Sequence, residues 1–206
     1  MLLKINAGFV FLFICATAFC PAPGSSIPVT EKWVILKDCS VTVNGSTNIN
    51  KFSCHIPEYL RTDTLICNTN GLNDAVALSG KLTLPVISFD CANKLITNDL
   101  RKTLKAKEFP ALHIYFLTLE KYPDVKGHET ISGTVNIELA GVAKKITVNY
   151  TFSINEQKVI SLAGTQSIRF SDFMLVPPRK LGGMIRTDDR LDISFVIHMK
   201  RIVDGG

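Results

Sequence analysis

The chain has 206 residues, of which 46% are hydrophobic and 20% are charged, with 23 Lys and Arg against 18 Asp and Glu. A chain this apolar can bury enough surface to offset its ordering entropy, which excludes a disordered or low-complexity protein. The formal net charge of +5 is too mild for a typical nucleic-acid binder, and the length suits one domain or two small ones.

The first 18 residues have the layout of a secretory signal peptide. After a basic start, residues 5–18 are almost wholly apolar and uncharged, and they end in the small-x-small cleavage sequence Ala16-Thr17-Ala18. The run is shorter than the roughly 20 residues of a membrane-spanning helix, although an uncleaved anchor is the alternative. Acylation of Cys20, as in a lipoprotein, is disfavoured by the bulky Phe19 before it. We expect cleavage near Ala18 and a periplasmic or secreted mature chain without a transmembrane span.

Residues 19–30 are predicted to be a linker, because they contain Gly24-Ser25-Ser26 and three prolines. The folded domain is expected over residues 31–203. From Lys32 onward the dominant pattern alternates apolar and polar residues, which is typical of half-buried strands. The segments with this pattern are 33–43, 52–56, 64–68, 81–89, 112–116, 135–139, 146–154, 160–170 and 191–199.

These segments predict eight or nine strands joined by short turns. Turn-forming residues occur at Asn44-Gly45, at Ala140-Gly141-Val142 and at Asn155-Glu156-Gln157. Short connections imply antiparallel neighbours, because parallel strands need a long crossover. A sheet of this size hides its apolar face by closing into a barrel or by stacking as a sandwich, and alternation alone does not choose between them.

One segment breaks the alternation. Residues 98–107 have apolar residues at helical spacing, Asn98 or Thr97 can cap the start, and Pro110 stops the helix. The lysines near its end suit the negative end of the helix dipole. We predict one amphipathic helix of about three turns, lying over a mainly antiparallel sheet.

Four cysteines of the expected domain share the apolar phase of their strands: Cys39, Cys54, Cys67 and Cys91. Four cysteines allow three pairings, and spacing alone does not choose one. Disulfides fit the oxidising compartment that a signal peptide implies, and buried free thiols are the alternative. A metal site is disfavoured, because the chain has no Cys-x-x-Cys motif and no close cluster of Cys and His.

The sequence contains no familiar catalytic motif: no Gly-x-Ser-x-Gly elbow, no phosphate-binding glycine loop and no His-Glu-x-x-His. His113 and His198 fall on the polar phase of their strands. Asp188-Asp189 is interpreted as a turn, and Ser171-Asp172 has no histidine tied to it by sequence. We therefore predict no catalytic residue, no metal and no cofactor.

A loosely basic stretch, with Arg179-Lys180, Arg186 and Arg190, surrounds Leu181-Gly182-Gly183 near the C-terminus. A solvated loop is the simplest interpretation of this stretch. The alternative is a gate, or a contact with anionic headgroups, near the mouth of a barrel.

Four segments, taken in order along the chain, carry a resemblance to a known family. They are residues 82–89 followed by 99–110, the hairpin 133–146, the strand 164–173 and the final strand from Asp188. Together they resemble the YceI-like family of secreted bacterial proteins, over residues 33–201. The resemblance implies a single antiparallel, lipocalin-like β-barrel with one helix.

The chain departs from the family pattern in two places. Asp38-Cys39-Ser40 stands where the family usually has His-Ser. Phe52-Ser53-Cys54 is similar to a variant branch in which a second Phe-x-Cys follows, here Phe89-Asp90-Cys91. The resemblance to that branch implies a Cys54–Cys91 disulfide, which leaves Cys39 to pair with Cys67.

The resemblance further implies a non-enzymatic protein whose barrel holds a polyisoprenoid or another long lipid. We predict that six side chains line this site: Phe89, Ile114, Phe116, Phe152, Phe170 and Phe195. A secreted enzyme, which would need converging titratable groups in a pocket, is one alternative. An envelope stress or interaction protein with a solid barrel and an exposed apolar patch is another. The sequence is also compatible with a homodimer.

Overall fold

The computed structural model describes residues 29–56, 59–71, 74–124 and 129–202. The predicted signal peptide at 1–18, Cys20, most of the predicted linker and His128 lie outside these ranges. The first strand begins at Val29, close to the predicted start of the domain at residue 31. No helix in the described part of the chain is long and apolar enough to cross a bilayer.

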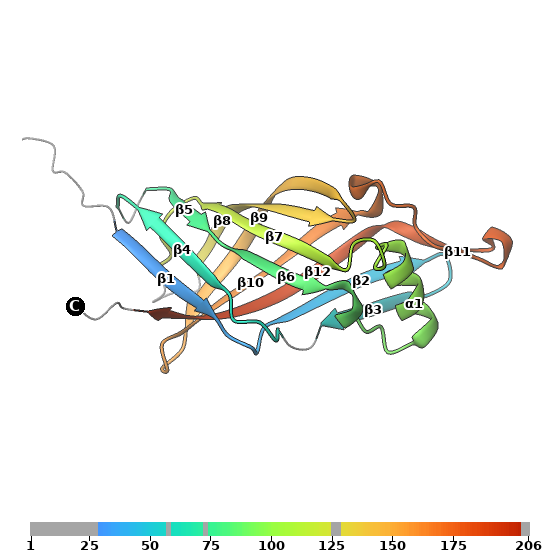
Figure 1. Ribbon diagram of the computed structural model, residues 1–206, viewed down its shortest axis with the longest axis horizontal. Helices are drawn as coiled ribbons and strands as arrows, with labels where there is room; N and C mark the ends of the chain where they lie inside the picture. The colour runs from blue at the N-terminus through green and yellow to red at the C-terminus, as the bar shows by residue number, and fades with distance from the viewer. Residues whose placement is uncertain (1–28, 57–58, 72–73, 125–128, 203–206) are drawn as a thin grey trace, which may run out of the picture.

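The described residues form a β-rich fold with one α-helix at one end (Figure 1). The strands are β1 (Val29–Ile35), β2 (Ser40–Thr47), β3 (Lys51–Ile56), β4 (Thr64–Thr69), β5 (Val76–Ser79), β6 (Lys81–Pro85), β7 (Ala111–Leu119), β8 (Glu129–Leu139), β9 (Val142–Ile154), β10 (Val159–Arg169), β11 (Arg179–Lys180) and β12 (Ile185–Ile202). The helix α1 spans Lys94–Thr103, and short 3-10 helices span Val86–Ser88 (η1), Phe170–Phe173 (η2) and Leu181–Gly183 (η3).

The sheet closes on itself through antiparallel pairs. The neighbours run from β1 through β4, β5, β7, β8, β9 and β10 to β12, and β12 pairs again with β1, where Trp33 lies opposite Arg201. β2, β3 and β6 continue β1, β4 and β5 lengthwise, so eight strand positions surround the barrel axis. This closure confirms the predicted antiparallel barrel and excludes the sandwich.

The barrel has a gap in its hydrogen bonding near α1. Within the described strands, β3 pairs only with β2 and β6 pairs only with β7. The Cys54–Cys91 disulfide links β3 to the segment between β6 and α1, next to an isolated bridge between His55 and Asp90. The predicted Cys54–Cys91 disulfide is therefore confirmed, and it fastens the segment that leads into α1.

The second predicted disulfide, between Cys39 and Cys67, is wrong, because both cysteines are free and buried. Cys67 lies opposite Glu31, four residues before the end of β1, which is roughly 13 Å of strand. Cys39 lies beyond that end, after the turn into β2. A disulfide needs Cα atoms within about 7 Å, so strand register keeps these two thiols apart.

The helix is displaced from its predicted position at residues 98–107 and spans Lys94–Thr103 instead. The side chain of Asn93, not of Asn98 or Thr97, caps it by accepting hydrogen bonds from the backbone N–H groups of Leu95 (2.9 Å) and Ile96 (3.2 Å). Thr97 is buried inside the helix and its hydroxyl accepts from the Cys91 N–H. The predicted amphipathic helix exists, but four residues earlier.

Two predicted turns are strands in the structure. Asn44-Gly45 lies within β2, and the chain reverses at residues 48–50 instead. Asp188-Asp189 lies within β12, where the register with β2 shifts between Thr187 and Leu191. Both aspartates accept hydrogen bonds from serines of other segments, Asp188 from Ser46 and Asp189 from Ser171, so partners distant in sequence hold them in the strand.

The end of the barrel far from α1 is sealed by aromatic packing. Trp33 is 1% exposed and meets Phe152 edge to face, with ring centroids 6.5 Å apart. Tyr122 also meets Trp33 edge to face, with ring centroids 6.2 Å apart. Its hydroxyl donates to the Glu31 carboxylate, as does the indole N–H of Trp33. Because the polar atoms of this cluster are paired, the seal costs no unsatisfied hydrogen bonds.

Candidate ligand site inside and above the barrel

The middle of the barrel contains a small cavity, the lumen cavity, whose volume is about 80 Å³. Inward-facing side chains from seven strands line it: Val41, Leu82, Ile114, Phe116, Val135, Ile137, Val148, Tyr150, Gln166, Ile193, Phe195 and Ile197. These positions alternate along each strand, so the apolar phase read from the sequence is the lining of the barrel. Typical ligand pockets hold about 300–1,000 Å³, so a chain-like ligand needs these side chains to move.

The exposure of the inward-facing side chains changes along the barrel. At the sealed end, Phe152, Ile160 and Leu162 are 0–1% exposed. Around the lumen cavity, Ile114 and Phe195 face the same interior but are only half-buried. Apolar surface left accessible costs about 25 cal/mol per Å², so filling this part of the barrel with apolar atoms is favourable.

The polar atoms of the lumen are few. Gln166 turns its side-chain amide back to donate to the Ser167 carbonyl at 3.0 Å. Burial raises the pKa of Tyr150, which keeps its hydroxyl neutral. The ring of Tyr150 meets Phe195 edge to face at 5.8 Å. The lumen cavity is therefore uncharged over its whole lining.

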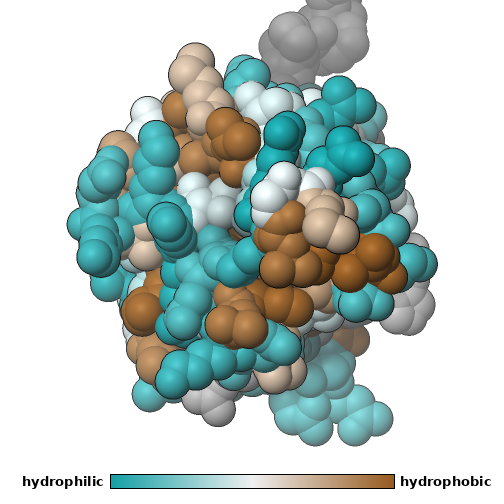
Figure 2. All heavy atoms as spheres, turned by 90° about the vertical axis from the view of Figure 1, so that its right-hand side faces the viewer, coloured by the Kyte–Doolittle hydropathy of each residue, from teal (hydrophilic) through white to brown (hydrophobic). Residues whose placement is uncertain are grey.

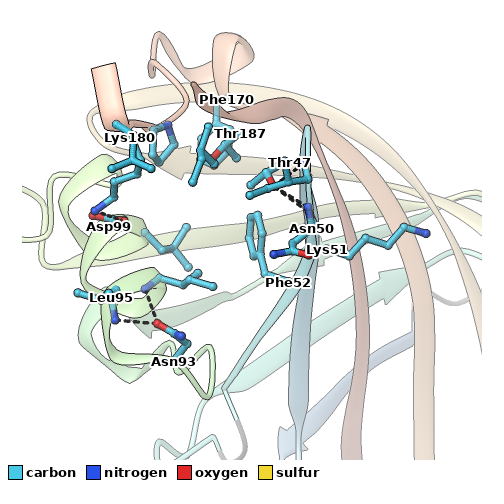
Figure 3. A pocket seen from close by; sticks show the side chains of 16 residues that line it. Thr47, Asn50, Lys51, Phe52, Asn93, Leu95, Asp99, Phe170, Lys180 and Thr187 are labelled. Carbon is cyan, nitrogen blue, oxygen red and sulfur yellow. Dashed lines mark hydrogen bonds and ion pairs between the residues drawn. The ribbon is translucent and has the colours of Figure 1, made fainter. Parts of the chain in front are cut away.

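A larger hollow of about 370 Å³, the mouth groove, lies at the α1 end of the barrel (Figure 3). Its walls come from α1, the β2–β3 turn, and the segment from η2 to the start of β12. The lining residues are Thr47, Ile49, Asn50, Lys51, Phe52, Asn93, Leu95, Ile96, Asp99, Leu100, Phe170, Pro178, Lys180, Leu181, Ile185 and Thr187. Its volume lies within the usual range for small-molecule sites.

One ion pair spans the rim of the mouth groove. The ammonium of Lys180 lies 2.8 Å from the Asp99 carboxylate on α1, which ties β11 to the helix (Figure 3). Both side chains are partly exposed, so the pair contributes little stability, on the order of 0–1 kcal/mol. Its main effect is to fix the position of the β11 segment over the groove.

The mouth groove and the lumen cavity lie one above the other along the barrel axis. On β10, Gln166 lines the lumen and Phe170, just past its end, lines the groove, a separation of roughly 13 Å. Leu191 and Gly45 are paired across β12 and β2 between the two levels, and the ring of Phe52 covers Gly45. An apolar layer that includes Phe52 therefore separates the two hollows.

The six predicted lining residues lie in four different places. Ile114, Phe116 and Phe195 line the lumen cavity, and Phe170 lines the mouth groove. Phe152 is buried in the sealed end, and Phe89 is buried beside η1, where its carbonyl accepts from Arg101. The structure thus brings together three of the six at the lumen.

Sequence reasoning missed most of the mouth groove. Its apolar residues Ile49, Leu95 and Leu181 lie in turns and on the outer face of the helix, and alternation does not mark such positions. One signal in the sequence could have pointed to the groove. Leu181, next to Gly182, is an aliphatic residue in a segment that is otherwise interpreted as a solvated loop. The sequence predicts a turn at Asn44-Gly45, whereas the chain reverses at residues 48–50, so the pattern does not identify the turn residues of the groove.

The titratable side chains singled out in the sequence do not converge on either hollow. The Ser171 hydroxyl donates to Asp189 and holds the pKa of that carboxyl below its usual value. His113 and His198 face outward and hydrogen-bond to Thr83 and Ser161 of adjacent strands. Among the described residues, no group of three or more His, Cys, Asp or Glu could hold a metal ion.

Solved structures share this architecture. BcnA from Burkholderia cenocepacia superposes with a TM-score of 0.59 at 17% identity, covering 78% of this chain and 95% of that chain. A polyisoprenoid binding domain from Saccharophagus degradans, implicated in plant cell wall breakdown, has a TM-score of 0.59 at 11% identity, covering 82% and 97%. At these identities the likeness concerns the fold alone.

No curated protein matches this chain. The model of the YceI-like domain family does match it, from residue 35 to residue 199. The match extends from the end of β1 to near the end of β12, so it takes in the lumen cavity, the mouth groove and the disulfide. The chain belongs to the YceI-like domain family.

Proposed function

We propose that this protein is a non-enzymatic binding protein that takes up one apolar, chain-like molecule, a polyisoprenoid or another lipid. The observation that carries the proposal is the set of inward-facing apolar side chains, including Ile114, Ile193 and Phe195, that stay half-buried in mid-barrel. Membership of the YceI-like domain family, and a fold shared with the polyisoprenoid binding domain from Saccharophagus degradans, support it. The chain-like shape of the ligand follows from two hollows stacked along one axis.

The ligand would occupy both hollows in our proposal. Its tail displaces the half-buried side chains of the lumen, and its first units lie in the mouth groove against Phe52 and Leu95. Each Å² of apolar area removed from water contributes about 25 cal/mol, so the two hollows together favour a long hydrocarbon over a compact one.

The place of action that we propose is outside the cytoplasm, after removal of residues 1–18. The Cys54–Cys91 disulfide supports this, because disulfides persist in oxidising compartments. An enzymatic role is less well supported. Among the described residues that line the lumen cavity, Tyr150 is the only titratable one. The mouth groove has Lys51 and the paired Lys180 and Asp99 in its lining.

A matched pair of variants on β10 tests the proposal. Gln166 faces the lumen and Thr165, its neighbour, is exposed on the outer face. We expect the delipidated protein to bind a fluorescent polyprenyl probe, Gln166→Phe to weaken binding at least tenfold, and Thr165→Phe to leave it unchanged. Equal binding by both variants, or no uptake by the wild-type protein, would favour the solid-barrel interaction protein instead.

A further inference from the structure

The segment between β11 and β12 forms a hairpin that projects from the α1 end of the barrel (Figure 1). Arg179 pairs with Arg186, and the chain turns through η3 with Leu181 and Met184 at the tip. These two side chains are 70% and 75% exposed. A Cβ atom added at Gly182 or Gly183 would meet no described atom within 4 Å, so open space surrounds the tip.

The tip belongs to a wider set of exposed apolar side chains at this end, which we call the apolar collar. Its members are Ile49, Leu95, Met174, Val176, Leu181 and Met184. Figure 2, which looks onto this end, shows brown apolar clusters between teal polar residues. Single exposed apolar residues are ordinary, but a group gathered at one end of a protein marks an interaction site.

Hydrogen bonds and one ion pair join three of the segments that carry the collar: the hairpin, the β2–β3 turn and α1. The Asn48 side chain donates to the Met184 carbonyl and accepts from the Arg186 N–H, both at 2.9 Å. This ties the hairpin to the β2–β3 turn that carries Ile49. The Lys180–Asp99 ion pair ties the same hairpin to α1, which carries Leu95.

The charges of the hairpin point to an anionic partner. Residues 177–187 contain three basic side chains and no acidic one. Arg179 and Arg186 lie directly opposite each other across the two strands, and both are exposed. Like charges in that position repel, and an anionic group between or beside them would relieve the repulsion. Aliphatic tips flanked by basic side chains are the pattern of a surface that inserts into an anionic lipid interface.

A protein partner fits these observations less well. Hot spots of protein interfaces are mostly Trp, Tyr and Arg, and the apolar members of the collar are Ile, Leu, Val and Met side chains without an aromatic one. The collar also surrounds the mouth groove, since Ile49, Leu95 and Leu181 line it as well. We propose that this end docks on an anionic lipid bilayer, with the tip of the hairpin inserted among the headgroups and Arg179 and Arg186 against their phosphates.

Vesicle flotation tests this docking with the full mature protein. We expect binding to vesicles of phosphatidylethanolamine with phosphatidylglycerol, and at least tenfold weaker binding to neutral phosphatidylcholine vesicles. Raising the salt concentration should weaken the first interaction, because exposed charges are screened. Binding to both vesicle types alike, or to neither, overturns the proposal.

Exposed leucines provide the matched control. Leu181→Asp is expected to abolish flotation, whereas Leu60→Asp, at a position 73% exposed in the loop between β3 and β4, should not affect it. Arg179→Gln with Arg186→Gln should weaken binding to anionic vesicles at least tenfold. Equal losses in the Leu181 and Leu60 variants would mean that the collar has no special role.

Docking and uptake of a ligand are separable in this experiment. Gln166→Phe obstructs the lumen far from the collar, so we expect it to float like the wild-type protein even when it no longer takes up the polyprenyl probe. Failure of that variant to float would show that vesicle binding is only the capture of lipid by the lumen.

Discussion

The aromatic ring of Phe52 on β3 lies over the Cα atom of Gly45 on β2, so closely that a Cβ atom at position 45 would overlap it. The same relationship recurs deeper in the barrel, where the ring of Phe195 lies over Gly164. In both cases a glycine within a strand makes room for an inward aromatic side chain. One pair lies at the mouth groove and the other at the lumen cavity.

Gly45→Ala should destabilise the protein by about 1–3 kcal/mol, because the methyl group forces Phe52 out of its position. Urea unfolding at equilibrium measures the change. Combining Gly45→Ala with Phe52→Leu should recover part of the loss, since the smaller side chain leaves room for the methyl group. An unaltered midpoint for Gly45→Ala alone would show that Phe52 is not held against position 45.

Two isoleucines distinguish a hollow interior from a filled one. Ile160 is 1% exposed at the sealed end, whereas Ile193 lines the lumen cavity and is half-buried. Ile160→Ala should cost about 2–5 kcal/mol, the usual range for a close-packed site. Ile193→Ala should cost at least about 1 kcal/mol less, because fewer atoms surround its side chain. Equal costs in thermal or urea unfolding would argue for a solid core at both levels.

Removing the Cys54–Cys91 disulfide should lower the free energy of unfolding by roughly 4 kcal/mol, from the loop-entropy model for a separation of 37 residues. Denaturation of Cys54→Ala with Cys91→Ala measures the loss. A reductant should shift the unfolding midpoint of the wild-type protein but not that of the double variant, because Cys39 and Cys67 are already free. Hydrogen exchange of amides near α1 should be faster in the double variant than in the wild-type protein.

Ionisation of Tyr59 should lower the free energy of unfolding at high pH. Burial, followed by its hydrogen bond to Asp63, raises the pKa of Tyr59 to about 12, above the unfolded value of about 10. The stabilising contribution is complete below about pH 10 and is lost as the pH rises through about 12, since the unfolded chain releases the proton first. Tyrosinate absorbance and circular dichroism, followed together, should report this transition.

Tyr59→Phe is the control for that transition. The variant cannot ionise at position 59, so its stability should fall less steeply between pH 10 and pH 12. At neutral pH it should be less stable than the wild-type protein, because the Thr83 N–H loses the hydroxyl oxygen to which it donates. An identical pH dependence in both proteins would assign the transition to another group.

Period-2 alternation predicted the strands well where a strand is long and half-buried. Residues 146–154 lie in β9 and 191–199 lie in β12, as expected. The expected strand at 33–43 is split, because the chain turns between Ile35 and Ser40 to pass from β1 to β2. A turn of that kind leaves the alternating phase on both sides nearly intact, so the sequence alone does not reveal it.

The remaining errors have one physical origin, which is contact between residues distant in sequence. Asn93 and Asn98 have the same capping ability, so the sequence does not choose between them. Asn93 caps the helix because the disulfide at Cys91 fixes the position of the chain just before it. The register of β1 with β4 places Cys67 opposite Glu31, far along the strand from Cys39. The mouth groove forms where β11 lies against α1, so alternation could mark inward-facing residues such as Ile114 and Phe195 but not the turn and helix residues that line the groove.

The aromatic packing around Trp33 closes one end of the barrel. In the binding function that we propose, a ligand would therefore enter and leave through the mouth groove, so that loading and unloading use the same opening. Exchange of one ligand for another would then be sequential. The protein could not take a ligand from one membrane while it releases another ligand to a second membrane.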